Sequence, residues 1–524
     1  MIEDRHMATD DEHPTGTNLV AARRRPRRAT GGIPQVSPRR LVNPFPPTEV
    51  LSADQVEAIH AASLKILRDT GIEVLGDRAI DLLRGAGAAV DGDTRRVRLD
   101  PAQVEELIVS APATFELHAR NAAWDITVGA RHLVFCSVGG PAFATDIERG
   151  RRPGTLEDMR ALTRLVGRLN VLHQEGGGAC EPTDVPVPVR HLEMYRTFAT
   201  LLDKTWHSLA YGRVTVEDAI EVACRMRGVT RERLAEESTL ITVVNTNSPL
   251  RLDGPMSDGL IAMAEAGQAV IATPFTLAGA MSPVTLAGSL ALQNAEALFM
   301  VALSQLARPG APMVYGGFTS NVDMRTGSPA FGTPEYVKAQ MATGQLARRY
   351  GLPWRSSNVT ASPVADAQAA YESEMAIWGA VMSGVNVLYQ GAGWLEGGLT
   401  ASFEKLILDA EMLQLISEVL QPVVVDEASL GLDAIADVGP GGHFFGTAHT
   451  LERFETAFYQ PLVSDWRNYE TWAEDGARTA TERAHDVWRR LLNEGEDPPL
   501  DQAVRESIDD FVDRRKAQIE AGGS

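Results

Sequence analysis

The chain contains little cysteine and is short of positive charge. Its three cysteines, Cys136, Cys180 and Cys224, lie far apart in the 524 residues and form no Cys-x-x-Cys pair. This sparse, odd set argues against a disulfide framework and favours a reducing compartment. The 49 lysines and arginines stand against 69 acidic residues, which gives a net charge of −20. Nucleic acid is therefore disfavoured as the main partner, because phosphate binding needs a basic surface.

Long apolar runs are also missing. No stretch approaches the roughly 18 consecutive apolar residues of a membrane span. Residues 23–28 (Arg-Arg-Arg-Pro-Arg-Arg) resemble a twin-arginine export signal, but no apolar segment follows them, so export is rejected. We expect a soluble, cytoplasmic protein. Residues 1–45 are polar, rich in arginine and proline and without periodicity. They predict a flexible tail, with a docking arm for an acidic partner or subunit as the alternative.

The motifs of the common catalytic centres are absent from the sequence. No His, Cys, Asp or Glu cluster has metal-ligand spacing, and there is neither a Gly-x-Ser-x-Gly elbow nor a P-loop. His443 and His449 lie six residues apart and form a possible pair of ligands, although an ordinary loop is the favoured interpretation. Lysines are few, and Lys204 stands only at the start of a predicted strand, so Schiff-base chemistry is unsupported. We expect no metal site in this chain.

From about residue 130 short apolar runs alternate regularly with longer amphipathic stretches. Strand starts recur about every 30 to 43 residues, the length of one strand–helix unit with its loops. The strand candidates are residues 132–138, 171–176, 205–210, 239–245, 269–274, 312–317, 353–359 and 385–390. The helix candidates are residues 155–168, 188–202, 215–227, 256–266, 285–307, 334–350, 366–383 and 402–420.

Eight strands that alternate with eight helices predict an α/β fold, a (β/α)8 TIM barrel over residues 126–421. A doubly wound open sheet is the competing topology. Such a sheet usually carries a glycine-rich phosphate loop after its first strand, and residues 138–141 (Val-Gly-Gly-Pro) do not match that fingerprint.

Smaller segments flank the predicted barrel. Residues 46–125 predict an α-rich N-terminal segment, whose first helix begins after the capping residue Ser52. Residues 422–524 predict a C-terminal appendage that ends in charged helices at 479–492 and 502–520. We expect this appendage to pack on the barrel or on a second subunit.

A barrel enzyme places its chemistry on the loops that follow the strands. In this chain those loops are rich in aromatic and amide side chains but poor in catalytic ions. Tyr315, Phe318, Tyr389 and Trp394 come from neighbouring strand ends, so they could share one cage. The faces of aromatic rings attract a quaternary ammonium without a full counter-ion. Each ring alone is more often part of the core.

At these residues the sequence resembles the trimethylamine methyltransferase (MttB) family, over about residues 40 to 470. The matching stretches are residues 282–288 (Ser-Pro-Val-Thr-Leu-Ala-Gly), 293–296 (Gln-Asn-Ala-Glu), 309–316 (Pro-Gly-Ala-Pro-Met-Val-Tyr-Gly), 323–327 (Asp-Met-Arg-Thr-Gly), 351–353 (Gly-Leu-Pro), 366–369 (Asp-Ala-Gln-Ala) and 392–398 (Ala-Gly-Trp-Leu-Glu-Gly-Gly). The stretches are specific as a set, and none is diagnostic alone.

The resemblance implies a methyltransferase that moves a methyl group from an amine to the cobalt of a corrinoid. The corrinoid (cobalamin) would be supplied by a small partner protein, and this chain itself would bind no cofactor. The founding archaeal enzymes carry pyrrolysine, whereas residues 356–360 here are ordinary amino acids. The sequence thus looks like the non-pyrrolysine branch, whose substrates are quaternary amines such as glycine betaine. Large barrels of this kind are expected to form homo-oligomers.

Under this interpretation the site needs few ionisable groups. A quaternary ammonium already leaves as a neutral amine, so the enzyme mainly holds the methyl–nitrogen bond in line with cobalt and excludes water. A betaine carboxylate still needs a partner, for which Arg355, His207 and Asn358 are candidates. Glu372 and Glu396, with Glu175, are candidates for holding the cationic end, and we predict Asn358, Glu372 and Glu396 as the catalytic set. Two alternatives stay open: a barrel that binds a quaternary amine without turnover, and an unrelated lyase or hydrolase.

Overall fold

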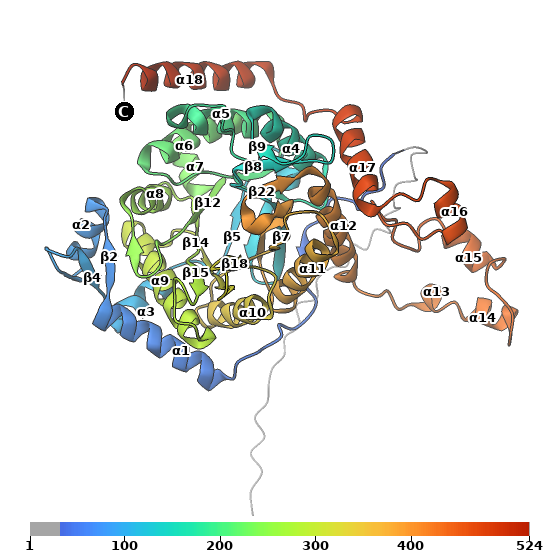
Figure 1. Cartoon of the computed structure of the whole chain (residues 1–524), viewed down its shortest axis with the longest axis horizontal. Coiled ribbons are helices and arrows are strands. Elements are labelled where there is room, and N and C mark those ends of the chain that lie inside the picture. Colours follow the sequence, from blue (N-terminus) through green and yellow to red (C-terminus); the bar gives the residue numbers. More distant parts are fainter. Residues whose placement is uncertain (1–31, 523–524) are drawn as a thin grey trace, which may run out of the picture. The chain divides into compact units, whose positions relative to one another are not determined.

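Eight parallel strands close into a barrel in the computed structural model, which describes residues 32–522 (Figure 1). The strands are β7 (His132–Ser137), β10 (Gln174–Glu175), β11 (Thr205–His207), β12 (Leu240–Val244), β14 (Ala269–Ala272), β16 (Met313–Gly316), β19 (Trp354–Ser357) and β20 (Val387–Ala392). Each pairs with the next, and β20 pairs back onto β7. The predicted TIM barrel is confirmed, and all eight strands fall inside the ranges that the periodicity predicted, apart from the last two residues of β20.

Eight helices follow the strands, and all of them match the predicted ranges to within a few residues. They are α4 (Leu156–Arg168), α5 (Val187–Leu201), α6 (Arg213–Arg227), α8 (Gly254–Glu265), α9 (Leu286–Ala307), α10 (Pro334–Arg349), α11 (Ala367–Met382) and α12 (Phe403–Val419). A short extra helix, α7 (Arg231–Glu236), comes before β12. Figure 1 shows these helices as a ring around the strands.

The barrel interior follows the two-residue period of its strands. Val134 and Cys136 of β7, Ile271 of β14 and Val314 of β16 are buried in one apolar cluster. The hairpin of β5 (Thr114–Leu117) and β6 (Ile126–Gly129) runs straight into β7 and adds its own apolar side chains to this cluster. The hairpin therefore closes the amino-terminal end of the barrel, and the carboxyl end is left for the ligand.

Strand residues of the opposite parity face the helices. Trp206 of β11 packs between Tyr195 and Phe198 of α5, with ring centroids 5.6 and 5.5 Å away. Helix α9 is long and apolar enough to cross a membrane, but 83% of its most apolar stretch is buried inside the protein. That degree of burial is typical of the core helix of a soluble protein.

The N-terminal segment contains the expected helices and also strands that the sequence did not predict. Ser52 caps α1 (Ala53–Lys65) through a capping box with Gln55, as its position predicted. A π-helical turn (Ile66–Thr70), α2 (Asp77–Gly85) and α3 (Pro101–Val109) follow. The missed strands are β2 (Ile72–Val74), β3 (Ala89–Val90) and β4 (Arg96–Arg98), which form a small sheet with β13 (Arg251–Leu252). Runs of two or three residues are too short to show an alternation.

Part of the predicted flexible tail is bound to the barrel. The Gln35 side chain donates to the carbonyl of Arg168 at 3.0 Å, and the Val36 N–H donates to Gln414 Oε1 at 2.9 Å. Strand β1 (Leu41–Val42) then pairs antiparallel with β7. Residues 35–45 are therefore part of the folded unit, which corrects the tail prediction over that stretch. The arginine-rich residues 23–28 lie outside the described residues.

The C-terminal region divides into two parts. Residues 426–459 belong to a separate unit with α13 (Glu427–Leu430), α14 (Leu432–Val438) and α15 (Ala448–Arg453). Residues 460–522 belong to the unit of the barrel and contain α16 (Tyr469–Glu474), α17 (Ala480–Glu494) and α18 (Gln502–Glu520). The two charged helices predicted near the C-terminus are α17 and α18.

The last two helices pack on the barrel's own helices. Trp488 of α17 lies 4.9 Å from Phe403 of α12, measured between ring centroids. Figure 1 shows α18 lying along α5, where Lys516 pairs with Glu193 at 2.8 Å. Apolar burial and ion pairs thus hold this part of the appendage against the barrel.

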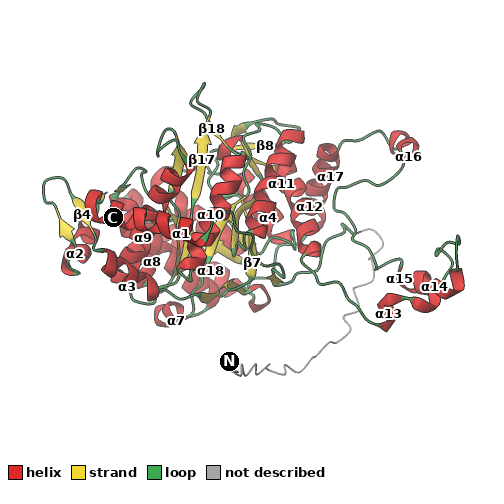
Figure 2. Ribbon diagram, turned by 90° about the horizontal axis from the view of Figure 1, so that it is seen from below, coloured by secondary structure: helices red, strands yellow, loops and turns green. Residues whose placement is uncertain are grey.

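Two small sheets extend the barrel at its carboxyl end. One consists of β15 (Phe275–Ala278), β17 (Phe318–Val322) and β18 (Pro329–Ala330), and the other of β21 (Trp394–Leu395), β22 (Thr400–Ser402), β8 (Phe143–Thr145) and β9 (Arg152–Pro153). Figure 2 shows β17 and β18 projecting beyond the helices at this end. The two sheets wall the space above the barrel strands.

The burial of the β5–β6 hairpin leads to a prediction about stability. Leu117 is fully buried in the interior cluster, so Leu117→Ala should lower the free energy of unfolding by about 2–5 kcal/mol through lost burial and a cavity. Val109 is 81% exposed at the end of α3, and Val109→Ala should change it by less than about 0.5 kcal/mol. Denaturant unfolding of both variants and the native chain measures these changes in the free energy of unfolding. Equal effects would contradict the assignment of the hairpin as the floor of the barrel.

Candidate functional site

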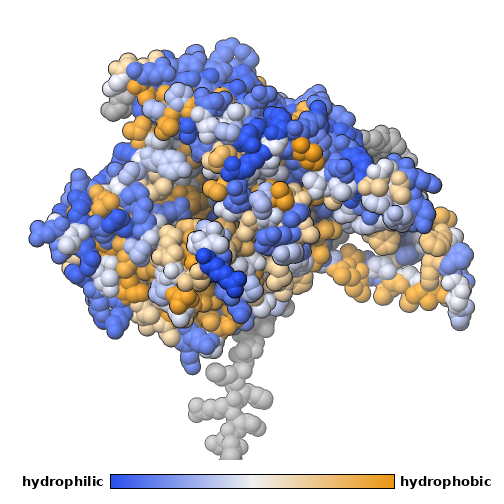
Figure 3. Space-filling view, viewed as in Figure 1, coloured by the Kyte–Doolittle hydropathy of each residue, from blue (hydrophilic) through white to orange (hydrophobic). Residues whose placement is uncertain are grey.

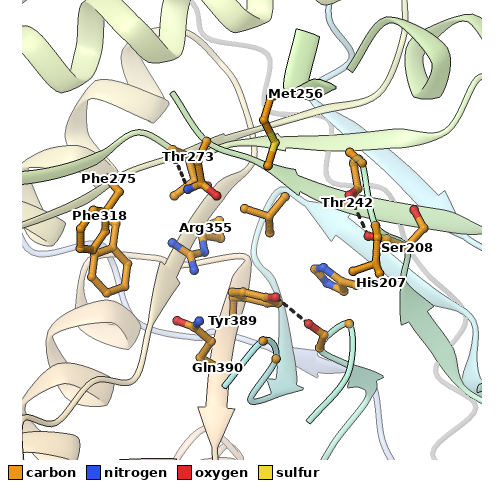
Figure 4. Close-up of a pocket in the computed structure, with 18 of the residues that line it drawn as sticks. His207, Ser208, Thr242, Met256, Thr273, Phe275, Phe318, Arg355, Tyr389 and Gln390 are labelled. Atoms are coloured by element: carbon orange, nitrogen blue, oxygen red, sulfur yellow. Dashed lines mark hydrogen bonds between the residues drawn. The ribbon is translucent and has the colours of Figure 1, made fainter. Parts of the chain in front are cut away.

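A cavity of about 440 Å³ opens at the carboxyl end of the barrel (Figure 4). Its walls come from seven of the eight strands or the residues directly after them, and from β15, β17 and β21 of the small sheets. Among the residues predicted for the site, it is lined by His207, Phe318, Arg355, Tyr389 and Trp394. The structure therefore brings together five of the nine side chains that the sequence singled out.

Arg355 is the charged centre of this cavity. It lies on β19 with its side chain inside the barrel and is only 2% exposed. Its Nε and Nη1 atoms are buried and have no hydrogen-bond partner among the described residues. Burial lowers the pKa of the guanidinium, which still stays cationic in a protein. Leaving a buried cation unpaired costs several kcal/mol, so the arrangement indicates a place for an anion.

Two aromatic rings flank the guanidinium. The Cζ atom of Arg355 lies 4.8 Å from the ring centroid of Tyr389 and 5.6 Å from that of Phe318. The Tyr389 hydroxyl donates to the carbonyl of Gly176 at 2.5 Å, which fixes the ring across the barrel. These ring faces already hold a cation, so they are poor places for a second one.

His207 lies beside Tyr389 as a neutral ring. The two rings stack with centroids 4.7 Å apart at 25°. The Nε2 atom of His207 lies 2.9 Å from Gln174 Oε1, whereas Nδ1 meets no polar partner within residues 32–522. Burial first, and then the charge of Arg355, lower the pKa of His207 to about 3. An imidazole held in this way can accept or donate a hydrogen bond but does not compete with Arg355 for an anion.

A second aromatic group forms the wall farther from Arg355. Phe275 and Trp394 lie 5.3 and 6.1 Å from Phe318 between ring centroids, and all three rings line the cavity. Gln390 also lines it, with a backbone φ of 56° and with Oε1 buried and unpaired within the described chain. A non-glycine residue rarely holds this left-handed conformation, and such strain gathers at functional sites.

Tyr315 does not join the predicted cage. Val314 of the same strand points into the barrel, so Tyr315 has the opposite parity and points out. Its hydroxyl donates to Asn294 Oδ1 of α9 at 2.6 Å, and its ring lies 5.7 Å from Tyr350. Tyr315 therefore fixes α9 to the barrel rather than touching the cavity.

The three residues predicted as catalytic also lie away from the cavity lining. Asn358 is fully buried and donates to the carbonyl of Gly391 at 3.0 Å. Glu372 of α11 accepts hydrogen bonds from Thr360 and from the Ala361 N–H. Glu396 pairs with Arg151 at 2.7 Å near the surface. The sequence placed them close to the right strand ends, but it could not show which way each side chain points.

Comparisons with known proteins show the family of this chain. The model of the family described as "Trimethylamine methyltransferase (MTTB)" matches residues 20–520. The chain belongs to this family. Its match to the glycine betaine methyltransferase of Desulfitobacterium hafniense (strain Y51) is 37% identical over 476 residues and covers 91% of this chain and 98% of the relative.

Trimethylamine methyltransferases are more distant relatives. The enzyme MttB of Desulfitobacterium hafniense (strain DSM 10664 / DCB-2) is 28% identical over 464 residues and spans 88% of this chain and 93% of its own. MttB of Methanosarcina thermophila is 25% identical over 469 residues, and the match spans 86% of this chain and 94% of the relative. These full-length likenesses support a methyltransferase function for this family member.

Several residues of the cavity were missed by the sequence prediction. Phe275, Met256 and Glu181 line it, and none was named as a site candidate. Phe275 directly follows the predicted strand 269–274, three residues after the end of β14. Reading one residue further past each strand would have found it. Met256 lies in the first turn of α8 and Glu181 in the loop between β10 and α5, where strand position gives no signal.

We also searched the described residues for clusters of metal-ligand side chains. Within residues 32–522 no group of three His, Cys, Asp or Glu side chains could hold an ion. The cavity combines the Arg355 cation, a neutral imidazole, two amides, a set of aromatic rings and the carboxylate of Glu181, which pairs with Arg190 at 3.3 Å. Such a set can bind and orient a small ion that carries both charges, but it holds few groups for proton transfer.

Glu175 beneath the cavity makes a pH-dependent prediction. Its carboxyl accepts the N–H groups of Gly177 and Gly178, yet burial outweighs these bonds and raises its pKa to about 8. The folded protein thus binds a proton that the unfolded chain releases above pH ~4.5. Its contribution to stability is complete below that pH and is lost as the pH rises to about 8.

The test compares the unfolding free energy of the native chain and Glu175→Gln between pH 4.5 and 8. As the pH rises, the unfolding free energy of Glu175→Gln should increase relative to that of the native chain. A difference that stays constant across this range would show that Glu175 does not take up a proton on folding.

Proposed function

We propose that this chain transfers a methyl group from a betaine, a quaternary amine that carries a carboxylate, to the Co(I) of a corrinoid held by a separate small protein. The observation that carries the proposal is the buried guanidinium of Arg355 in the cavity, whose Nε and Nη1 lack partners in the described part of the chain. A carboxylate would pair with one edge of this guanidinium through charge-assisted hydrogen bonds. Trimethylamine and choline have no such group.

The placement of the rings supports one orientation of a betaine. Arg355 covers the faces of Tyr389 and Phe318 and repels a second cation there. The ammonium group would therefore turn toward Trp394 and Phe275, farther from the guanidinium. Aromatic faces hold such a cation by electrostatic attraction and by contact with its methyl groups. One betaine molecule would thereby match the separation of charge in the cavity.

The reaction needs no acid or base from the protein. The electron pair of Co(I) forms the new bond to the methyl carbon, while the carbon–nitrogen bond breaks and leaves its pair on nitrogen. The products are a methyl–Co(III) corrinoid and a neutral tertiary amine, so no proton moves. What the chain contributes is alignment and exclusion of water. A neutral His207 and an unpaired Gln390 amide fit this role better than ionised groups would.

The open end of the barrel is suited to receive the corrinoid protein. Nearly every loop at this end exposes a large apolar side chain: Ile147, Val187, Tyr211, Val284, Met324, Val364 and Leu399. Figure 3, which views this end, shows hydrophobic residues in the middle of the face and hydrophilic residues above them. Exposed apolar side chains around a cavity are typical of a surface that binds another protein.

The activity test supplies free Co(I)-cobalamin and follows its visible spectrum with glycine betaine, carnitine, proline betaine, choline and trimethylamine. We expect conversion to methyl–Co(III) with one or more of the three betaines and little with choline or trimethylamine. If none reacts, even with a corrinoid protein present, while a betaine still binds, the barrel is a binding protein without turnover. Turnover of trimethylamine in preference to every betaine would contradict the role of Arg355.

Replacing Arg355 tests the carboxylate partner directly. Arg355→Met should lower kcat/KM for the reactive betaine by roughly 30- to 5,000-fold, as expected when one member of a buried charge pair is removed. The exposed Arg325 in the turn between β17 and β18 provides a matched control, because it lies outside the cavity lining. Arg325→Met should leave kcat/KM for the betaine, measured with free cobalamin, unchanged. Equal losses in both variants would argue against a specific contact.

A further inference from the structure

Trp394 is held in the cavity wall by two anchors that lie outside the cavity. Its ring is buried and packs on Phe318 and Phe331, with centroids 6.1 Å away in both cases. The indole Nε1 donates to the carbonyl of Thr360 at 3.1 Å. The N–H of the preceding residue, Gly393, donates to Asp409 Oδ2 at 2.8 Å. One anchor fixes the ring and the other fixes the backbone that carries it.

The first anchor ends on Glu372. This carboxylate accepts the Thr360 hydroxyl at 2.5 Å and the Ala361 N–H at 2.9 Å, and Gln368 donates to its other oxygen at 2.9 Å. Glu372 is 8% exposed on α11 and is not among the residues that line the cavity. Its bonds set the position of the loop after β19, and that loop supplies the carbonyl which receives the indole N–H.

The second anchor ends on a buried ion pair. Asp409 of α12 pairs with Lys405, whose Nζ also donates to Ser373 Oγ at 2.8 Å. Ser373 follows Glu372 on α11, so both anchors meet on the same helix. Gly393, which Asp409 holds, has a φ of 102°. Only glycine adopts such a backbone readily, so the turn into Trp394 depends on both this residue and its carboxylate partner.

We infer that Glu372, acting through Thr360, is a positioning residue for the indole of Trp394 and thereby sets the affinity of the cavity for the ammonium end of its substrate. The inference rests on the proposed function for its kinetic readout. Glu372 does not line the cavity and does not contact the substrate. It holds the acceptor that orients the ring, in concert with the Asp409–Lys405 pair that holds the backbone.

The kinetic test uses the full chain with free Co(I)-cobalamin and the reactive betaine. Glu372→Ala should raise KM by roughly 2- to 30-fold, the range of one cation–π contact, without lowering kcat. Glu372→Gln keeps an acceptor for the Ala361 N–H and should restore part of the affinity. Glu374→Ala is the matched control on the same helix, because that carboxylate bonds to Trp378 instead. A KM change of equal size in the control would overturn the inference.

A double-mutant comparison separates positioning from a general structural effect. If Glu372 acts through the ring, Glu372→Ala should have no further effect on KM in a Trp394→Leu background. Additive effects would overturn the inference. Thr360→Val removes the hydroxyl but keeps the shape of the side chain, so it should raise KM as Glu372→Ala does. It replaces Glu372→Ala in this test if that variant does not fold.

A spectroscopic readout keeps this test distinct from that of the activity. The near-ultraviolet circular dichroism of Trp394 is obtained as the difference between the native chain and Trp394→Phe. That band should change in Glu372→Ala and Thr360→Val and stay the same in Glu374→Ala. If no amine reacts, the proposed function fails, but the circular dichroism comparison still tests the positioning role independently. An unchanged band in both Glu372→Ala and Thr360→Val would refute the positioning role.

Discussion

The arrangement of the site depends on one buried positive charge. Arg355 lies inside the barrel next to an apolar cluster of strand residues, with two of its nitrogen atoms unpaired within the residues that the structure describes. A cation in such surroundings is costly unless a partner of opposite charge arrives. The flat rings of Tyr389 and Phe318 on either side lower that cost, and the cavity above gives the partner access. The cavity is therefore built to receive an anion.

The rest of the cavity complements this charge. Burial, and after it the charge of Arg355, keep His207 neutral. The nearby ring faces are occupied by the guanidinium, so a cationic group must lie toward Trp394 and Phe275. A site that separates an anion-binding end from an aromatic end is suited to a zwitterion. Because displacement of a neutral amine by a strong nucleophile needs no proton, the scarcity of acids and bases follows from the reaction that we propose.

The fold could be predicted from the sequence almost completely because the strand–helix period is long and regular. The strands outside the barrel, such as β2, β5, β15 and β17, and the short helices α7 and α13 to α16 were missed, since segments of so few residues carry little periodic signal. The site was harder to predict. The rule that chemistry follows strand ends found Arg355, Tyr389 and Trp394 correctly as cavity residues. It failed to separate Tyr315 from its inward-facing neighbour Val314, because one residue along a strand reverses the side.

The predicted catalytic residues illustrate a second limit. Asn358 and Glu372 are polar residues near the correct strand end, as a catalytic residue would be, but their hydrogen bonds go to loop backbone and hydroxyl groups behind the cavity. Only the three-dimensional hydrogen-bond pattern distinguishes a residue that touches a ligand from one that supports the loop.

The most direct test of the central claim is a crystal structure of the protein with glycine betaine bound. We predict that the carboxylate lies within hydrogen-bond distance of the Arg355 guanidinium and that the trimethylammonium group points toward Trp394 and the open end of the barrel. A betaine whose carboxylate lies away from Arg355, or whose ammonium group lies at the barrel floor, would contradict it.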